Sequence, residues 1–134
     1  MSLAVLDACA MIAYLRGESG DVVVDGALCE PDTICYAHAI NLWEVYYDFL
    51  RFSDAETAGR ALRRLRDVGV RTRRDMNESF LRSVGTLKAR GGLSLADCFC
   101  IALAEAVGAD LYTSDHHEFD RHVPLGLCSV LFIR

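Results

Sequence analysis

Several features of membrane, secreted and disordered proteins are absent from this sequence. It has only 2 prolines in 134 residues and no internal repeat or low-complexity segment, which excludes a long disordered region. No apolar run reaches the ~18 residues needed to cross a bilayer. The apolar N-terminus lacks the basic start of a signal peptide and is interrupted by Asp7. We therefore expect a cytoplasmic protein without membrane association.

The signatures of several common sites are missing as well. The 6 cysteines form no C-x-x-C pair and mostly lie in apolar runs, which favours reduced core thiols over disulfides or a zinc site. No P-loop, G-x-G-x-x-G loop or Ser-His-Asp order is present. The chemistry of the chain therefore has to come from other residues.

The charges that are present are unevenly distributed. The net charge is −5, which argues against a simple basic nucleic-acid binder. Residues 51–90, however, hold 11 basic and 5 acidic residues, whereas the rest of the chain holds 3 basic and 14 acidic ones. Such asymmetry is typical of a basic binding face beside an acidic site, although two ordinary solvated helices would also produce it.

Apolar runs alternate with helical patterns along the chain. Strands are predicted at residues 3–6, 33–36, 70–72, 110–113 and 130–133. The helices between them are predicted to begin near Ala8, Asp21 and Ala37, and at capping boxes that start with Ser53, Asp75 and Ser94. The length and the 52% hydrophobic content fit one domain spanning residues 1–134. The alternation predicts an α/β fold with a parallel sheet covered on both faces.

Two predicted strands lead directly into an aspartate. Asp7 follows the apolar run 3–6, and Asp115 comes two residues after the run 111–113. In open α/β sheets, ligands bind outside the carboxyl ends of the strands. Each aspartate also has a purely structural interpretation, because Asp is a favoured helix N-cap. The two roles are compatible.

Two further carboxylates lie in helices that look buried. Glu44 is surrounded in sequence by apolar residues, and a buried carboxylate is costly unless it is paired, hydrogen-bonded or bound to a metal. Metal ligation is one interpretation for Glu44. An equally good one is structural: a core hydrogen bond to a Tyr or an Arg, or exposure along a narrow stripe with Asp48 and Arg51. Asp97 lies in a capping box, Ser94-Leu-Ala-Asp97, ahead of the apolar run Cys98-Phe-Cys-Ile, so it is either a cap partner or a ligand.

Together the four carboxylates favour a metal site. Like charges that converge at one sheet edge repel each other without a cation. A set of oxygen ligands selects hard cations, Mg²⁺ or Mn²⁺, which activate water and stabilise the charge that develops in phosphodiester cleavage. Three histidines lie close by in sequence, and we expect them at the surface, with contact to a substrate phosphate as the lesser alternative: His116, His117 and His122.

The motifs that carry these acids resemble those of the PIN-domain (PilT N-terminus) nucleases, most closely the VapC-type toxin ribonucleases. They are Leu6-Asp7, Asn41-Leu-Trp-Glu44, Ser94-Leu-Ala-Asp97 and Thr113-Ser-Asp115-His-His-Glu-Phe119. Each motif alone is weak, but four in this order cover nearly the whole chain and are fairly specific.

The resemblance implies a three-layer α/β/α sandwich, Rossmann-like in layout, and metal-dependent endonucleolytic cleavage of RNA. It implies that Asp7 and Asp97 are the principal metal ligands. Glu44 and Asp115 would complete the cluster and orient the attacking water, and Thr113 would hydrogen-bond a carboxylate. Proteins of this type are commonly homodimers, and the toxins among them are neutralised by a cognate antitoxin.

Six arginines are candidates for contacts to RNA phosphates, which position a substrate without reading its bases. They are Arg60, Arg63, Arg64, Arg71, Arg73 and Arg74. An equally good interpretation is that they solvate their helices, or pair with a second copy of the chain or an acidic antitoxin segment.

Other functions fit the sequence less well. A haloacid-dehalogenase-type phosphatase needs a second aspartate at position 9, which is Cys9, and a receiver domain needs a late lysine, whereas the only lysine is Lys88. The remaining alternatives are an RNA-processing PIN nuclease without an antitoxin and a non-catalytic binding or regulatory module of the same fold.

Overall fold

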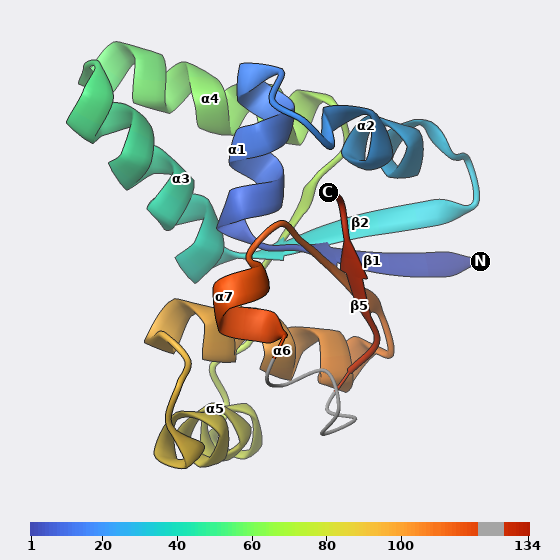
Figure 1. Cartoon of the computed structure of the whole chain (residues 1–134), viewed down its shortest axis with the longest axis vertical. Helices are drawn as coiled ribbons and strands as arrows, with labels where there is room; N and C mark the ends of the chain where they lie inside the picture. Colours follow the sequence, from blue (N-terminus) through green and yellow to red (C-terminus); the bar gives the residue numbers. More distant parts are fainter. Residues whose placement is uncertain (121–127) are drawn as a thin grey trace.

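A five-stranded parallel sheet forms the centre of the computed structural model, which describes residues 1–120 and 128–134 (Figure 1). The strands are β1 (Ser2–Leu6), β2 (Thr33–His38), β3 (Arg71–Arg73), β4 (Asp110–Thr113) and β5 (Val130–Phe132). Their order is β3-β2-β1-β4-β5, and every neighbouring pair is parallel. The first strand is therefore the central one, with β2 and β4 on its two sides.

Helices cover both faces of the sheet. They are α1 (Ala8–Arg16), α2 (Asp21–Cys29), α3 (Ala39–Phe52), α4 (Ala55–Asp67), α5 (Glu78–Arg90), α6 (Leu95–Val107) and α7 (His116–Phe119). In Figure 1, α1, α2 and α4 lie above the strands, and α5 and α6 lie below them. Within the described residues, no helix is both long and apolar enough to cross a membrane.

Strand β1 divides the core between these two layers. Ala4 and Leu6 pack with α1, α2, α3 and α4, whereas Val5 packs with α5 and α6. All three side chains are almost completely buried, because both faces of a parallel strand are covered by helices. The α/β fold with three layers that the sequence predicts is confirmed.

Three of the predicted helix starts are displaced by one or two residues, and two of these lie at predicted capping boxes. Helix α4 is capped by Asp54 rather than Ser53, with the Thr57 N–H donating to the Asp54 carboxylate at 2.7 Å. Helix α5 is capped by Asn77 rather than Asp75. The carboxylate of Asp75 is instead paired with the Arg73 guanidinium at 2.9 Å, which removes it as a cap.

Helix α3 begins at Ala39, two residues later than predicted, because β2 continues to His38. The expectation that this helix is buried on nearly every side is wrong. Its buried side is narrow, whereas four large apolar residues on the opposite side are exposed: Ile40, Trp43, Tyr47 and Leu50. They recur at spacings of three and four residues, so they form one continuous row, called here the α3 stripe. The high apolar content of α3 therefore does not mean that every side of this helix is buried within one chain.

The cysteines only partly follow the expectation of core thiols. Cys35, Cys98 and Cys100 are buried and Cys128 is half-buried, but Cys9 and Cys29 are exposed. Each of the six is a free thiol in the part of the chain that the structure describes.

The start of α2 packs closely against the C-terminal segment through a glycine. Gly20 precedes α2 with φ at 95°, a left-handed conformation that disfavours any residue with a Cβ. A Cβ at this position would lie 2.8 Å from the carbonyl oxygen of Ile133. Both the backbone angle and the close approach therefore require glycine.

Gly20→Ala is expected to lower the free energy of unfolding by more than about 1 kcal/mol, because alanine is strained in the left-handed region. Gly26→Ala is the matched control, since Gly26 lies within α2 and nothing lies within 4 Å of its added Cβ. This control should raise the free energy of unfolding by ~0.5–1 kcal/mol, because Gly is unfavourable inside a helix. Urea denaturation of both variants measures the difference, and equal effects would contradict the assignment of Gly20.

Candidate metal centre

Asp7 has the N-cap role and the position after the first strand that the sequence suggested. It follows the central strand β1 and is the N-cap of α1, where its carboxylate accepts a hydrogen bond from the Ala10 N–H at 2.8 Å. Its own N–H donates to the Tyr112 carbonyl of β4 at 3.2 Å. The side chain is only 1% exposed. Asp7 is thus a rigid, buried carboxylate at the carboxyl end of the middle strand.

The neighbouring strand β4 brings Thr113 and Asp115 to the same edge. Leu6 of β1 is paired with Tyr112 of β4, so the next residues, Asp7 and Thr113, lie beside each other. The buried Thr113 side chain hydrogen-bonds the Asp7 carboxylate, and its hydroxyl oxygen accepts from the Asp115 N–H at 3.0 Å. Asp115 then caps α7 by accepting from the Glu118 N–H at 3.0 Å.

Helices α3 and α6 supply the other two predicted acids. Glu44 is half-buried in α3, and its carboxylate accepts a hydrogen bond from the Asn41 amide at 3.1 Å. Asp97 is half-buried in the first turn of α6, where its N–H donates to the Ser94 hydroxyl at 3.1 Å. The predicted capping role of Ser94 is therefore observed, and the Asp97 carboxylate lies at the same edge as the others.

Glu118 is an acid at this edge that the sequence interpretation did not select. Oxygens of Asp97, Asp115 and Glu118 all lie within 4.8 Å of one another. One carboxylate oxygen of Glu118 is buried and has no hydrogen-bond partner among the described residues. The three-residue spacing of Asp115 and Glu118 is typical of a capping box, and the same spacing places both side chains on one side of a helical turn. We call Asp7, Glu44, Asp97, Asp115 and Glu118 the carboxylate site.

Burial raises the pKa values of three acids of this site, and repulsion by neighbouring acids adds to the rise for two of them. Burial raises the pKa of Asp7 from 3.8 to about 7; repulsion by Asp97 and Glu44 adds to the rise, and the Thr113 and Ala10 hydrogen bonds oppose it. Burial likewise raises the pKa of Asp97 from 3.8 to about 7, with repulsion from Glu44, Glu118 and Asp115 adding to it. Burial also raises the pKa of Glu44.

These residues fit a hard divalent cation. They offer only carboxylate oxygens, the ligands that Mg²⁺ and Mn²⁺ prefer. A bound cation would offset the repulsion that raises the pKa values of Asp7 and Asp97, and it would provide a partner for the unpaired oxygen of Glu118. Mg²⁺ and Mn²⁺ satisfy the site equally well on these grounds.

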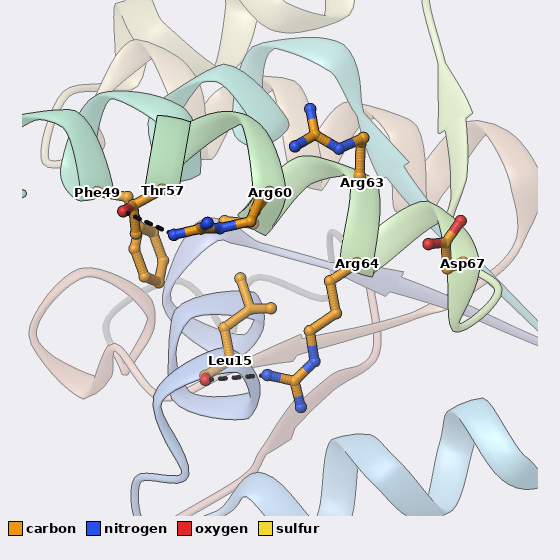
Figure 2. A pocket seen from close by; sticks show the side chains of 8 residues that line it. Leu15, Phe49, Thr57, Arg60, Arg63, Arg64 and Asp67 are labelled. Atoms are coloured by element: carbon orange, nitrogen blue, oxygen red, sulfur yellow. Dashed lines mark hydrogen bonds between the residues drawn. The ribbon is translucent and has the colours of Figure 1, made fainter. Parts of the chain in front are cut away.

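The six candidate arginines lie in two places. Arg60, Arg63 and Arg64 of α4 line a groove of about 480 Å³ with Leu15 of α1 and Phe49 of α3 (Figure 2). Arg64 reaches across this groove to the Leu15 carbonyl oxygen at 3.5 Å. Leu15 is in the last turns of α1, roughly 12 Å along the helix from Asp7, so this groove is remote from the carboxylate site.

The other three arginines lie on or directly after β3. Arg73 is held by Asp75, whereas Arg71 and Arg74 are exposed and form no ion pair within residues 1–120 and 128–134. Because β3 runs parallel to β1, Arg74 follows its strand at the same sheet edge as Asp7. Of the two groups of arginines, the one at β3 therefore lies at the sheet edge that carries the carboxylate site.

The histidines near the site are exposed where they are described. The ring of His116 hydrogen-bonds Asp120 at 2.9 Å and the Arg134 carbonyl oxygen at 2.8 Å, and it stacks on Phe132. His117 is also exposed, so the expected surface position is confirmed for both. His122 lies outside the described residues.

Comparison with known proteins identifies a family. The family model of the PIN domain matches residues 4–123. No curated protein matches the sequence.

Three solved structures share the fold. A chain in the structure of VapBC2 from Rickettsia felis, bound to a DNA fragment from their promoter, has a TM-score of 0.73 and 14% identity, with 97% of this chain and 98% of that chain covered. A chain of a toxin-antitoxin complex from Klebsiella pneumoniae has a TM-score of 0.70 and 17% identity, with 98% of each chain covered. VapC20 from Mycobacterium tuberculosis, a sarcin-ricin loop cleaving toxin, has a TM-score of 0.68 and 14% identity, with 90% of this chain and 95% of that chain covered. The resemblance expected from the sequence motifs is confirmed.

The raised pKa of Asp7 predicts a pH-dependent stability in metal-free buffer. The stabilising effect of the neutral carboxyl is fully present below pH 3.8 and is lost as the pH rises to about 7, because only the folded chain retains the proton in this range. Asp7→Asn removes this loss and keeps an equally good N-cap. With EDTA, the melting temperature of the variant relative to wild type should therefore rise from about pH 4 to about pH 7. If the difference in melting temperature between the variant and wild type did not change with pH, Asp7 would not be a buried carboxyl with a raised pKa.

Proposed function

This chain belongs to the PIN-domain family, and from that premise we propose that it is a Mg²⁺- or Mn²⁺-dependent endoribonuclease, the toxin of a toxin–antitoxin pair. One observation carries the proposal: oxygens of Asp97, Asp115 and Glu118 lie within 4.8 Å of one another, and burial together with repulsion by neighbouring acids raises the pKa values of Asp7 and Asp97 to about 7. An acidic cluster of this kind is suited to a divalent cation and to hydrolysis of a phosphodiester bond.

Asp7 and Asp97 would be the principal ligands, with Glu44, Asp115 and Glu118 completing the set. When bound, Mg²⁺ or Mn²⁺ lowers the pKa of water and stabilises the charge that develops on the phosphate oxygens. Asp7 is held in place by the Ala10 N–H and by Thr113, so its carboxylate needs little reorganisation to bind.

Glu44 and Asp115 would orient the attacking water and accept its proton. Glu44 is fixed by the Asn41 amide, and Asp115 by its N–H bond to the Thr113 hydroxyl. A carboxylate held in this way keeps its geometry while a water is aligned with the phosphorus. The supporting role assigned to Thr113 follows from its contacts to both Asp7 and Asp115.

We propose that Arg71 and Arg74 contact the RNA phosphates. They are exposed, and Arg74 follows β3 at the edge where the carboxylates lie. Arg73 is already paired with Asp75, and the groove formed by Arg60, Arg63 and Arg64 lies at the far end of α1. Those four are therefore weaker candidates for substrate contacts.

Two protein partners are part of the proposal. A cognate antitoxin is proposed because a structural neighbour from Klebsiella pneumoniae is a toxin-antitoxin complex. A homodimer is proposed because the α3 stripe exposes large apolar side chains, with Trp43 at 57% and Tyr47 at 58%. Contiguous exposed apolar surface marks interaction sites, and in a two-fold dimer the same stripe packs against its copy.

Purified protein with Mn²⁺ or Mg²⁺ should cleave RNA internally, and Asp97→Asn should reduce the rate by at least ~100-fold, the loss expected when a group central to catalysis is removed. Asp32→Asn is the matched control, since this exposed residue precedes β2 at the opposite end of the sheet. Cleavage of a panel of transfer, ribosomal and messenger RNAs is followed on denaturing gels, with circular dichroism to confirm folding. Equal cleavage by wild type and Asp97→Asn would refute the site, and metal binding without cleavage would favour a binding module.

The double variant Trp43→Glu/Tyr47→Glu should be monomeric, because four buried charges in the paired stripes would oppose association. The control Val22→Glu alters another exposed apolar residue, on α2, which is 74% exposed. Sedimentation velocity should show a dimer for wild type and for the control. A wild-type monomer, or a dimer that survives the double substitution, would rule out this interface.

A further inference from the structure

We propose that Asn41 is a positioning residue of the carboxylate site, whose single amide group links Glu44 of α3 to the start of α6 and thereby supports metal binding. The inference rests on the proposed function, because it assigns Asn41 a role toward the same cation. It is not one of the acids, and its hydrogen bonds among the described residues go to Glu44 and to the backbone beside Asp97.

The amide of Asn41 makes two hydrogen bonds that point to different helices. Its Nδ2 donates to the Glu44 carboxylate at 3.1 Å, within α3. The same nitrogen donates to the carbonyl oxygen of Ala96, in α6, also at 3.1 Å. Ala96 directly precedes Asp97, so one planar group joins two members of the carboxylate site.

The orientation of this amide is dictated by its partners. A primary amide has two N–H donors on one side and a carbonyl oxygen on the other. A carboxylate and a carbonyl oxygen are both acceptors, so both must face the nitrogen. An amide turned by 180° would place oxygen against oxygen at both contacts. Asn41 is therefore held in one rotamer, and it holds Glu44 in return.

Packing alone does not account for an asparagine at this position. The side chain is 0% exposed, and its carbonyl oxygen is buried without a hydrogen-bond partner among the described residues. A buried acceptor that is left unpaired lowers stability, whereas an apolar side chain of similar shape avoids that loss. The two donors of Asn41 are what an apolar residue lacks, and both of them serve the carboxylate site.

A second contact joins the same two helices without reaching the acids. His38 caps α3 by accepting from the Ile40 N–H at 3.1 Å, and its ring lies against Phe99 of α6 with centroids 4.8 Å apart. Apolar contact of this kind is not directional, so it brings α3 and α6 together but does not aim a carboxylate. The amide and the ring contact can therefore be separated by mutation.

The expected consequence is on metal affinity rather than on RNA binding. Residues that orient metal ligands through hydrogen bonds commonly change metal affinity or activity by ~10–100-fold when they are lost. Without Asn41, Glu44 is free to rotate away and the first turn of α6 loses its link to α3. Groups that contact RNA phosphates, such as Arg71 and Arg74, are untouched.

The test compares Asn41→Leu with Phe99→Leu. The first removes both amide donors and keeps a branched side chain, and the second loosens the same helix pair through the ring contact. Mn²⁺ affinity is measured by isothermal titration calorimetry without RNA, and melting temperatures report folding. Asn41→Leu should weaken Mn²⁺ binding by about tenfold or more, while Phe99→Leu should leave it within about twofold of wild type. If Asn41→Leu does not fold, Asn41→Ser, which is smaller and keeps one donor, should show a weaker effect in the same direction.

Cleavage kinetics give the second readout. The Mn²⁺ concentration for half-maximal RNA cleavage should rise for Asn41→Leu by the same factor as the dissociation constant, with the KM for RNA unchanged. The proposal would be overturned if Asn41→Leu bound Mn²⁺ as tightly as wild type. It would also be overturned if Phe99→Leu lost as much Mn²⁺ affinity as Asn41→Leu while the two variants had the same melting temperature. If the wild type binds Mn²⁺ but cleaves no RNA, the proposed function fails while the role of Asn41 is still decided by calorimetry. If the wild type binds no Mn²⁺, both are overturned.

Discussion

Asp7 is buried at the carboxyl end of the central strand, next to other acids. The rest of the site depends on the groups that stabilise the negative charge of its carboxylate. Burial and repulsion both favour the neutral carboxyl, which is why its pKa rises to about 7. Within the described residues, two hydrogen bonds oppose that rise, from the Ala10 N–H in the first turn of α1 and from the Thr113 hydroxyl. In the proposed function, a cation would oppose it as well. The fold supplies the two hydrogen bonds through local geometry, since α1 starts directly after β1 and Thr113 is the register neighbour on β4.

Much of this arrangement could be predicted because it is local in the sequence. An apolar run that ends in Asp predicts both a strand end and a helix start, and parallel strands bring such ends to one edge. The positions of Asp7 and Asp115 follow from this rule, whereas Asp97 is placed by the capping box Ser94-Leu-Ala-Asp97 at the start of α6. Glu118 did not follow, because the spacing Asp115-x-x-Glu118 is the same for a capping box and for two ligands on one helical turn. Only the distances separate the two interpretations.

The features that could not be predicted depend on contacts between distant segments. Asn41 and Ala96 are 55 residues apart, and nothing near Asn41 in the sequence indicates that its amide reaches α6. The capping boxes at Ser53 and Asp75 were misplaced for a related reason. A better cap follows each of them, and the Asp75 carboxylate is engaged by Arg73, which a search for local patterns does not weigh. The exposure of the α3 stripe was missed because apolar composition does not distinguish a buried side of a helix from an exposed one.

The arrangement of acids that suits cation binding therefore lowers the stability of the metal-free protein. Carboxylates that bind a cation tightly must be close together and partly dry, and the same closeness makes the metal-free protein less stable as they ionise. The carbonyl oxygen of Asn41 and one oxygen of Glu118, which have no hydrogen-bond partner in the part of the chain that the structure describes, add to this cost, whereas an apolar edge at the same place would add to stability. The sheet and the packing of the helices against it are built mainly from apolar contacts that do not involve the acids, although Asp7 and Asp115 also cap α1 and α7. The fold can therefore hold these groups together while they disfavour it. A cation that binds the folded chain would reverse the sign of this effect, because binding to the native state alone stabilises that state.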